Sequence, residues 1–294
     1  MSMVIGNKKG KGFTVAVASG KGGTGKTTVA VCLALCFDKE VQLLDCDVEE
    51  PNAHIFINPG SLMEEQVLVP VPTLDESKCT GCGKCNGLCA FNAIAFLEKP
   101  LFFPDLCHSC GLCAKVCPEG AIKEVGKNIG RLETGVKGKV HLVSGCMNVG
   151  IAMSPPVIRA VKEKAANAAL RIIDCPPGTA CSFVTSVKNS DFVLLVTEPT
   201  PFGLHDMKLA VKVIKLLKLP FGVLVNKSVS GDDCIGKFCK SEKMALLMRI
   251  PEDRKIAEAY SRGIPLLETM PELKDEFEKL LQDMKDLCGG GSEK

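Results

Sequence analysis

Aromatic side chains are scarce in this sequence, whose 294 residues include no tryptophan and one tyrosine. The formal net charge is only +2, so the chain lacks both the stacking groups and the excess positive charge typical of nucleic-acid binding, and no nucleic-acid partner is expected. No uninterrupted apolar run reaches about 20 residues, which excludes a membrane-spanning helix. The first twelve residues carry Lys8, Lys9 and Lys11 without the apolar run of a secretion signal, so we expect a cytoplasmic protein.

Cysteine, in contrast, is abundant, with 17 residues. Because cytoplasmic thiols stay reduced, disulfides are not expected, and metal ligation is the simplest explanation for eight of the cysteines. Five others lie in apolar segments or beside the motifs described below, where a free cysteine acts as a small hydrophobe: Cys32, Cys36, Cys46, Cys175 and Cys181.

Eight cysteines form two runs of matching spacing. The runs are Cys79-x2-Cys82-x2-Cys85-x3-Cys89 and Cys107-x2-Cys110-x2-Cys113-x3-Cys117-Pro118. In bacterial ferredoxins with this spacing, three close thiolates hold one [4Fe-4S] cluster and the fourth reaches the other cluster. The spacing therefore predicts two clusters, one held by Cys79, Cys82, Cys85 and Cys117 and the other by Cys107, Cys110, Cys113 and Cys89. Structural zinc is the alternative for paired Cys-x2-Cys motifs, but the full duplicated spacing favours clusters.

A glycine-rich loop, GKGGTGKT at residues 20–27, follows an apolar strand and opens a helix. In this pattern bare backbone amides approach a phosphate, and the helix N-terminus adds positive potential. We expect Lys26 to bridge the β- and γ-phosphates and Thr27 to offer its hydroxyl to Mg²⁺. Lys21 is unusual, because an ordinary phosphate loop does not require a second lysine there. The loop residues expected at the nucleotide are Gly20, Gly22, Gly23, Thr24, Gly25, Lys26, Thr27 and Thr28.

Strands and helices alternate on both sides of the cysteine-rich stretch. This alternation predicts an α/β fold, a doubly wound and mostly parallel sheet with helices on both faces. Strands are expected at residues 13–19, 41–45, 170–174, 192–197, 221–226 and 245–250, and helices near residues 26–37, 155–168 and 203–217. Residues 73–127 are expected to form an inserted small α+β domain, because residues 79–94 are repeated in residues 107–122. Residues 1–72 and 128–294 would be the two parts of one P-loop domain.

The loop SGKGGTGKTT at residues 19–28 resembles the deviant phosphate loop of the MinD, ParA, Mrp and nitrogenase iron protein superfamily. In that superfamily the additional lysine, matched here by Lys21, reaches the nucleotide of the facing subunit. The resemblance thus implies a homodimer that sandwiches two nucleotides. Residues 45–47 (DCD) resemble the first switch segment. Asp47 matches the aspartate that positions or deprotonates the attacking water, and Asp45 would support Mg²⁺ or its waters.

The second half of the chain continues this resemblance. Residues 170–178 (LRIIDCPPG) resemble the second switch segment, in which Asp174 would hold a water on Mg²⁺ and the Gly178 amide would sense the γ-phosphate. Asn226 and residues 250–253 resemble the adenine-reading elements of the superfamily. The adenine-site residues implied are Asn226, Pro251, Glu252 and Asp253.

The similarity runs from about residue 13 to residue 270 and is strongest to superfamily members with an inserted ferredoxin domain. One departure is Ala90, where a ferredoxin often has proline after the fourth cysteine. It removes no ligand.

The three aspartates also fit this chemistry on physical grounds. Phosphoryl transfer to water requires charge neutralisation and an oriented nucleophile more than covalent chemistry. Asp45, Asp47 and Asp174 each follow an apolar strand, and open parallel sheets bind ligands at such strand ends. Together with Lys21 and Lys26, Asp47 and Asp174 are therefore the expected catalytic residues.

Three further cysteines, Cys146, Cys234 and Cys239, are candidates for extra metal ligands or for thiols that catch a cluster in transit. Their spacing does not form Cys-x2-Cys, so ordinary thiols are favoured.

An amphipathic helix is expected near the C-terminus, from the apolar positions between residues 273 and 287. Six acids against three lysines between Glu272 and Leu287 disfavour anionic lipid. Packing against the sheet is therefore preferred over a membrane anchor.

The leading interpretation is a Mg-dependent ATPase, converting ATP and water to ADP and phosphate, whose nucleotide-driven dimer switching acts on two [4Fe-4S] clusters. Three outputs stay open. The protein would assemble or transfer iron-sulfur or metal cofactors to an unknown client apo-protein, or deliver low-potential electrons to a redox partner under ATP control. Alternatively, it would act as a MinD-like positioning or regulatory ATPase whose clusters sense redox state.

Overall fold

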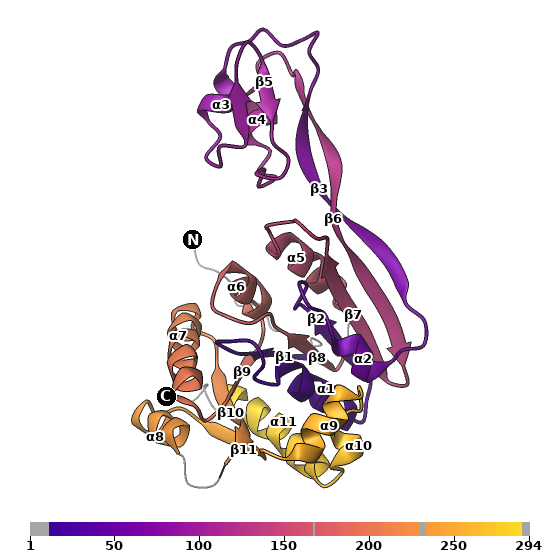
Figure 1. Ribbon diagram of the computed structural model, residues 1–294, viewed down its shortest axis with the longest axis vertical. Coiled ribbons are helices and arrows are strands. Elements are labelled where there is room, and N and C mark those ends of the chain that lie inside the picture. The colour runs from indigo at the N-terminus through magenta and orange to yellow at the C-terminus, as the bar shows by residue number, and fades with distance from the viewer. Residues whose placement is uncertain (1–11, 167, 230–232, 290–294) are drawn as a thin grey trace.

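The computed structural model describes residues 12–166, 168–229 and 233–289 (Figure 1). The expectation about a secretion signal therefore lies mostly outside the described residues. The strands are β1 (Phe13–Ala18), β2 (Val41–Asp45), β3 (Met63–Leu74), β4 (Ile94–Phe96), β5 (Pro100–Phe102), β6 (Ile122–Lys137), β7 (Val140–Met147), β8 (Leu170–Asp174), β9 (Phe192–Thr197), β10 (Phe221–Ser228) and β11 (Leu246–Pro251). The helices are α1 (Lys26–Cys36), α2 (Ala53–Ile57), α3 (Lys84–Gly87), α4 (Leu112–Val116), α5 (Pro155–Glu163), α6 (Cys181–Val187), α7 (Pro201–Leu217), α8 (Cys234–Ser241), α9 (Arg254–Ser261), α10 (Leu266–Thr269) and α11 (Leu273–Gly289).

One large sheet organises the molecule, with strand order β11-β10-β9-β1-β8-β2-β7-β6-β3. The pairs from β11 to β7 are parallel, whereas β6 and β3 continue the sheet as antiparallel strands. Parallel strands need crossover connections, and helices provide most of them here. The predicted doubly wound, mostly parallel α/β fold is confirmed.

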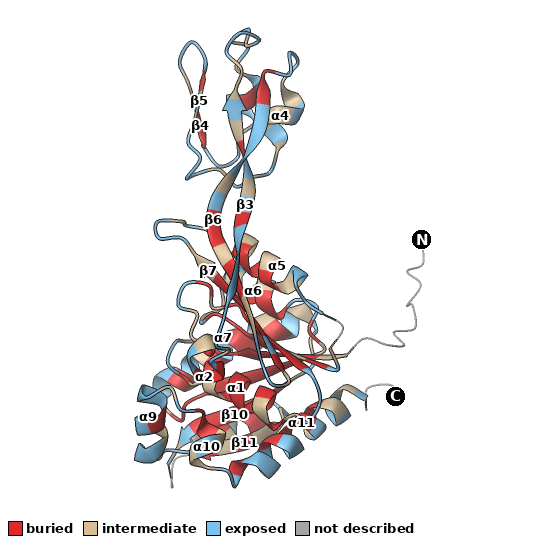
Figure 2. Ribbon diagram, turned by 90° about the vertical axis from the view of Figure 1, so that its right-hand side faces the viewer, coloured by how far each residue is buried: buried red, intermediate tan, exposed pale blue. Residues whose placement is uncertain are grey.

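Helices cover both faces of this sheet because residues along each strand alternate between two cores. In β1, Val15 and Val17 pack against α1, α2, α10 and α11, while Ala16 and Ala18 face the side covered by α5, α6, α7 and α8. Figure 2 shows the buried residues concentrated in the sheet and the helix faces against it. The apolar face of α11 is buried on the first side, so the expected packing of the C-terminal helix is confirmed. Among the described residues, no helix is long and apolar enough to cross a membrane.

A two-stranded ribbon carries the cysteine-rich segment away from the sheet (Figure 1). β7 pairs with β6 only over residues 130–137, so residues 68–74 of β3 and 122–128 of β6 pair with each other alone and project outward. We call these two segments the ribbon, residues 75–121 the lobe, and the remainder the body. The lobe contains α3, α4 and the hairpin of β4 and β5, around a small core built on Cys85, Ile94 and Ile122.

A strand of the main sheet was missed by the sequence analysis, and one expectation about a helix was wrong. No strand was expected at residues 122–137, which form β6 of the main sheet. The helix expected at residues 155–168 ends at Glu163. Beyond it, the Gln42 side chain of β2 donates to the Lys164 carbonyl over 3.0 Å and accepts from the Ala166 amide over 2.7 Å. These bonds replace those of a continuing helix.

Candidate functional site

The phosphate loop joins β1 to α1 at the carboxyl edge of the parallel sheet. Gly23 and Gly25 have φ values of +74° and +89°, a region that favours glycine. A Cβ on Gly25 would also lie 2.2 Å from Nδ2 of Asn226, so a side chain is excluded there by contact as well as by conformation. Lys26 and Thr27 form the first turn of α1, and both are buried. Their polar atoms and the free amides of the helix N-terminus therefore face one site.

Two residues at the end of β10 form hydrogen bonds to the backbone of this loop. Asn226 donates its amide to the Thr24 carbonyl over 2.8 Å, and Lys227 donates to the Gly23 carbonyl over 3.1 Å. Asn226 was expected to read adenine. The structure adds a contact that fixes the loop itself.

Lys21 forms an ion pair within its own chain. Its Nζ lies 2.8 Å from Oε2 of Glu198, while Lys227 lies 2.5 Å from Oε1 of the same carboxylate. Partial burial alone would raise the pKa of Glu198, but the hydrogen bonds from both lysines outweigh it and hold this pKa below its usual value. Glu198 is therefore a carboxylate between two cations.

A large cleft lies over the loop and encloses about 1660 Å³, counting its open mouth. Eleven expected residues line it: Gly22, Gly23, Gly25, Lys26, Thr27, Thr28, Asp47, Asn226, Pro251, Glu252 and Asp253. Six others do not line it, namely Gly20, Lys21, Thr24, Asp45, Asp174 and Gly178. The size and the polar loop suit a nucleotide, with the phosphate end at Lys26 and the far end at α9.

The cleft also contains residues that sequence reasoning missed: Glu50, Asn52, Pro177, Lys227, Arg254, Ile256, Ala257 and Tyr260. Asn52 and Glu50 follow the expected first switch segment within five residues, so a wider window around the motif finds them. Tyr260 packs beside Phe56 of α2, with ring centroids 5.0 Å apart and the ring planes tilted by 39°. The two residues are far apart in the sequence, so no local sequence pattern predicts their contact.

Asp45 is hydrogen-bonded to the loop that follows β2. It is fully buried, and its carboxylate accepts hydrogen bonds from the backbone amides of Asp47 (3.2 Å), Asn52 (3.1 Å) and Ala53 (3.1 Å). Burial, and then the neighbouring Asp174, raise its pKa well above the ordinary value. Asp45 therefore holds the loop that carries Asp47 in place, and its expected support of Mg²⁺ or of the waters on it stays a prediction.

Asp47 and Asp174 remain available for chemistry. Burial raises the pKa of Asp47 to about 6, against the lowering effect of Lys26. Asp174 is fully buried, and neither of its carboxylate oxygens has a hydrogen-bond partner among the described residues. Burial raises its pKa to about 7, opposed by the nearby Thr27 hydroxyl and Lys26. An unpartnered buried carboxylate beside a threonine hydroxyl fits a hydrated Mg²⁺, which prefers oxygen ligands.

Replacing Asp174 by asparagine is expected to stabilise the nucleotide-free protein at pH 8 by on the order of 2 kcal/mol. The Asp174 carboxyl titrates near 3.8 when unfolded and near 7 when folded. Between these values the folded chain keeps a proton that the unfolded chain releases, so stability falls as pH rises through this window. Thermal unfolding at pH 5 and pH 8 checks this, with Asp38→Asn, an exposed carboxyl, as control. An unchanged pH dependence in Asp174→Asn would contradict the assigned burial cost.

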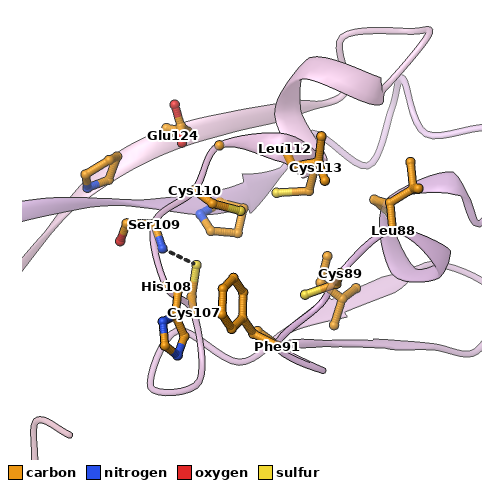
Figure 3. A pocket seen from close by; sticks show the side chains of 16 residues that line it. Leu88, Cys89, Phe91, Cys107, His108, Ser109, Cys110, Leu112, Cys113 and Glu124 are labelled. Atoms are coloured by element: carbon orange, nitrogen blue, oxygen red, sulfur yellow. Dashed lines mark hydrogen bonds between the residues drawn. The ribbon is translucent and has the colours of Figure 1, made fainter. Parts of the chain in front are cut away.

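The eight cysteines of the two runs lie around two cavities in the lobe. One cavity is lined by Cys107, Cys110, Cys113 and Cys89, together with Cys85 (Figure 3). The other is lined by Cys79, Cys82, Cys85 and Cys117. Each of the two predicted sets of four thus meets at one cavity, including the crossed fourth cysteine. In the described part of the chain, no three His, Cys, Asp or Glu side chains are close enough together to hold a single metal ion.

The two runs also share backbone geometry. Gly83 and Gly111, each two residues before the third cysteine of its run, both have φ of +70° and begin α3 and α4. Backbone amides donate to one cysteine of each predicted ligand set, both in the second run: Ser109 donates to Cys107 Sγ over 3.4 Å and Ala121 to Cys117 Sγ over 3.3 Å. Thiolate ligands of iron-sulfur clusters are tuned by such hydrogen bonds. The donor set and its surroundings therefore fit two clusters.

The three further cysteines remain outside both the cleft and the cysteine cavities. Cys146 and Cys234 are half-buried at the end of β7 and the start of α8, and Cys239 is buried in the core. Burial raises the pKa of Cys239 to about 11, as for an unreactive thiol.

Comparisons with known proteins agree with this geometry. The profile of the family described as "CobQ/CobB/MinD/ParA nucleotide binding domain" matches residues 15–266. An uncharacterised protein of Methanocaldococcus jannaschii is 32% identical over 255 residues, covering 85% of this chain and 89% of its own. The protein named "Iron-sulfur cluster carrier protein" of Pyrococcus horikoshii is 27% identical, with 95% of this chain and 89% of its own covered.

Solved structures show the same fold. The septum site-determining protein MinD of Pyrococcus horikoshii, solved with Mg-ADP, superposes with a TM-score of 0.55 at 22% identity, covering 94% of this chain and 97% of its own. The McdA(D38A)-ATP complex of Cyanothece gives a TM-score of 0.57 at 17% identity, with coverage of 94% and 98%. At these identities the likeness concerns the fold of the chain alone.

Proposed function

This chain belongs to the CobQ/CobB/MinD/ParA nucleotide-binding family as a P-loop ATPase of the MinD, ParA and Mrp type, and we propose that it couples ATP hydrolysis to two [4Fe-4S] clusters for cofactor assembly or transfer. The observation that carries the proposal is the sorting of eight cysteines into two cavities, four predicted ligands at each. The iron-sulfur carrier name of several relatives supports the same function.

Hydrolysis would use the residues around the cleft in separate roles. Lys26 and the loop amides neutralise phosphate charge, and Asp47 orients the attacking water and receives its proton. Thr27 and Asp174 would hold Mg²⁺, directly or through its waters, and the ion would neutralise charge that develops on the phosphate oxygens. Because the Asp47 pKa is about 6, its carboxylate is mostly ionised at neutral pH and can accept that proton.

Iron and sulfide analysis of anaerobically purified protein tests the cluster half of the proposal. About eight irons and eight inorganic sulfides per chain are expected, because eight thiolates in ferredoxin order hold two [4Fe-4S] clusters. About two zinc ions and no inorganic sulfide would refute it.

Single cysteine variants test the sorting of the ligands. Cys82→Ser and Cys110→Ser, at the exposed second cysteine of each run, are each expected to remove about half of the iron and to change different cluster signals. Cys181→Ser, an exposed cysteine outside the lobe, is the matched control and should keep all iron. Nucleotide affinity should be retained in all three, since the cleft is built from the body. Loss of nucleotide binding in a lobe variant would contradict a separable lobe.

ATP-controlled delivery of low-potential electrons is the second candidate. Electron delivery is favoured by the presence of four predicted cysteine ligands at each cavity of the lobe, because a cluster with four protein ligands suits a redox centre that stays in the protein. Mixing the loaded protein with an apo-ferredoxin acceptor separates the two. Transfer of iron to the acceptor supports the carrier function. Iron retained while the reduced clusters pass their electrons to an added low-potential viologen acceptor upon ATP addition supports electron delivery.

A further inference from the structure

A small cavity lies where the lobe meets the body, apart from the nucleotide cleft. Its lobe side is formed by Pro104, Asp105 and Cys107, and its body side includes residues 150–153. Lys127 of the ribbon also lines it and pairs with Asp105, Nζ to Oδ1, over 2.5 Å. Cys107 is the first predicted ligand of the second cluster. One ligand of that cluster therefore lines the same cavity as residues of the body.

A β-bulge bends the ribbon beside the same cavity. Val67 pairs with Gly130 and Leu68 with Asn128, so Ile129 has no partner in β3. Ile129 is buried, lines the cavity, and accepts a hydrogen bond at its carbonyl from the Asn148 amide over 2.9 Å. Bulges redirect a strand and increase its twist. The loop that follows β7 is thus hydrogen-bonded to the bulge, and the bulge sets the direction in which the strands run toward the lobe.

The first switch segment touches the start of that loop. Val48 directly follows Asp47, and its carbonyl accepts from the Met147 amide over 2.8 Å. A Cβ on Gly145 would lie 2.7 Å from Val48, so the two segments pack without room for a side chain. Because close-packed interiors transmit displacement, a shift of Asp47 and Val48 moves Met147 and the loop beyond it.

The cavity of the other predicted cluster lacks such a neighbour. Its lining residues all fall between Leu74 and Ile122, within the lobe and the end of the ribbon. In the part of the chain that the structure describes, the body lines neither of the two cysteine cavities. It shares the separate small cavity with Cys107, a predicted ligand of one cluster only.

We infer that nucleotide binding acts selectively on the cluster held by Cys107, Cys110, Cys113 and Cys89, through the contact between residues 150–153 and the turn before Cys107. This inference rests on the proposed function and deepens it by assigning the nucleotide response to one of two clusters. Met153 and Lys127 are the positioning residues of the contact. Coupling requires an element that both sites bias, and the loop of residues 148–153 is that element.

Amide hydrogen exchange of the full chain, purified anaerobically, tests the inference with and without a non-hydrolysable ATP analogue and Mg²⁺. Exchange in residues 103–110 is expected to change by about threefold or more upon binding, whereas exchange in residues 79–85 stays within about 1.5-fold. The potential of the second cluster should shift in parallel. An equal response of both segments, or none in residues 103–110, overturns the inference.

Two variants and a control show whether the contact carries the effect. Met153→Asp places a charge in the cavity, and Lys127→Ala removes the ion pair, so each should reduce the response of residues 103–110 by at least half at unchanged analogue affinity. Lys99→Ala removes a comparable ion pair with Glu76 inside the lobe and should leave the response intact. A full response in both contact variants contradicts the inference.

Failure of the proposed function gives a different result. Protein without iron and sulfide would refute the cluster proposal, yet exchange in the two segments would still report whether nucleotide reaches the turn before Cys107. If the protein holds two full clusters and hydrogen exchange changes equally in residues 79–85 and 103–110, the proposed function is retained. The inference that nucleotide acts on one cluster only is then rejected.

Discussion

Asp47→Asn is expected to lower ATP turnover by about 100- to 10,000-fold while ATP binding changes little. Asparagine keeps the size of the side chain and loses the ability to receive the proton of the attacking water. The Asp47 carboxylate lines the cleft, and its pKa of about 6 suits a group that accepts a proton at neutral pH. Steady-state phosphate release and equilibrium binding of a fluorescent ATP analogue measure the two quantities separately.

Lys26→Ala is the contrasting variant. Lys26 is buried at the first turn of α1, where its charge balances bound phosphate in the ground state, so its removal is expected to abolish tight nucleotide binding. Glu49→Gln, an exposed neighbour outside the cleft, is the matched control and should retain near-normal turnover. Equal loss of affinity in Asp47→Asn and Lys26→Ala would show that the role given to Asp47 is wrong.

The parallel part of the fold could be predicted because its signals are local. β1, β2, β8 and β9 are short, mostly apolar runs that lie within two or three residues of glycine, proline or charged residues, and each was expected within one residue of its observed bounds. β6 escaped prediction for a physical reason. Its outer half is exposed on a two-stranded ribbon, and Gly126, Gly130 and Gly135 interrupt the alternation that marks a half-buried strand.

In the site, too, residues within a local motif could be predicted, whereas residues brought together by the fold could not. The phosphate loop and the cysteine runs have fixed spacing, so their members could be named from the sequence, and each set of four cysteines lies around a common cavity. Glu198 could not be found in this way. It lies 177 residues from Lys21 in the sequence, and its role arises from the adjacency of β1, β9 and β10 in the sheet. Similarly, the backbone bonds that occupy Asp45 depend on how the loop before α2 folds back.

Lys21→Ala is expected to prevent ATP-dependent dimerisation while leaving ATP binding nearly intact, weakening the dimer by at least about tenfold. Lys21 does not line the cleft of its own chain and is paired with Glu198 there, so it is dispensable for the ordinary phosphate cradle. To reach a nucleotide across an interface, Lys21 must leave Glu198. Asp47→Asn with ATP should therefore sediment as a dimer, and Asp47→Asn combined with Lys21→Ala should sediment as a monomer with ATP bound.

Glu198→Gln tests the release of Lys21 from the opposite direction. Glutamine removes the charge that holds Lys21, so dimerisation in the Asp47→Asn background is expected at lower ATP concentration than with Glu198 present. The replacement also weakens the hold on Lys227, which contacts the phosphate loop at Gly23. Lys227→Ala therefore serves as the control, because it loses the same loop contact without freeing Lys21. If both variants shift the dimerisation midpoint equally, the effect arises from the loop and not from Lys21. A dimer that forms equally well with and without Lys21 would leave its proposed reach across the interface without support.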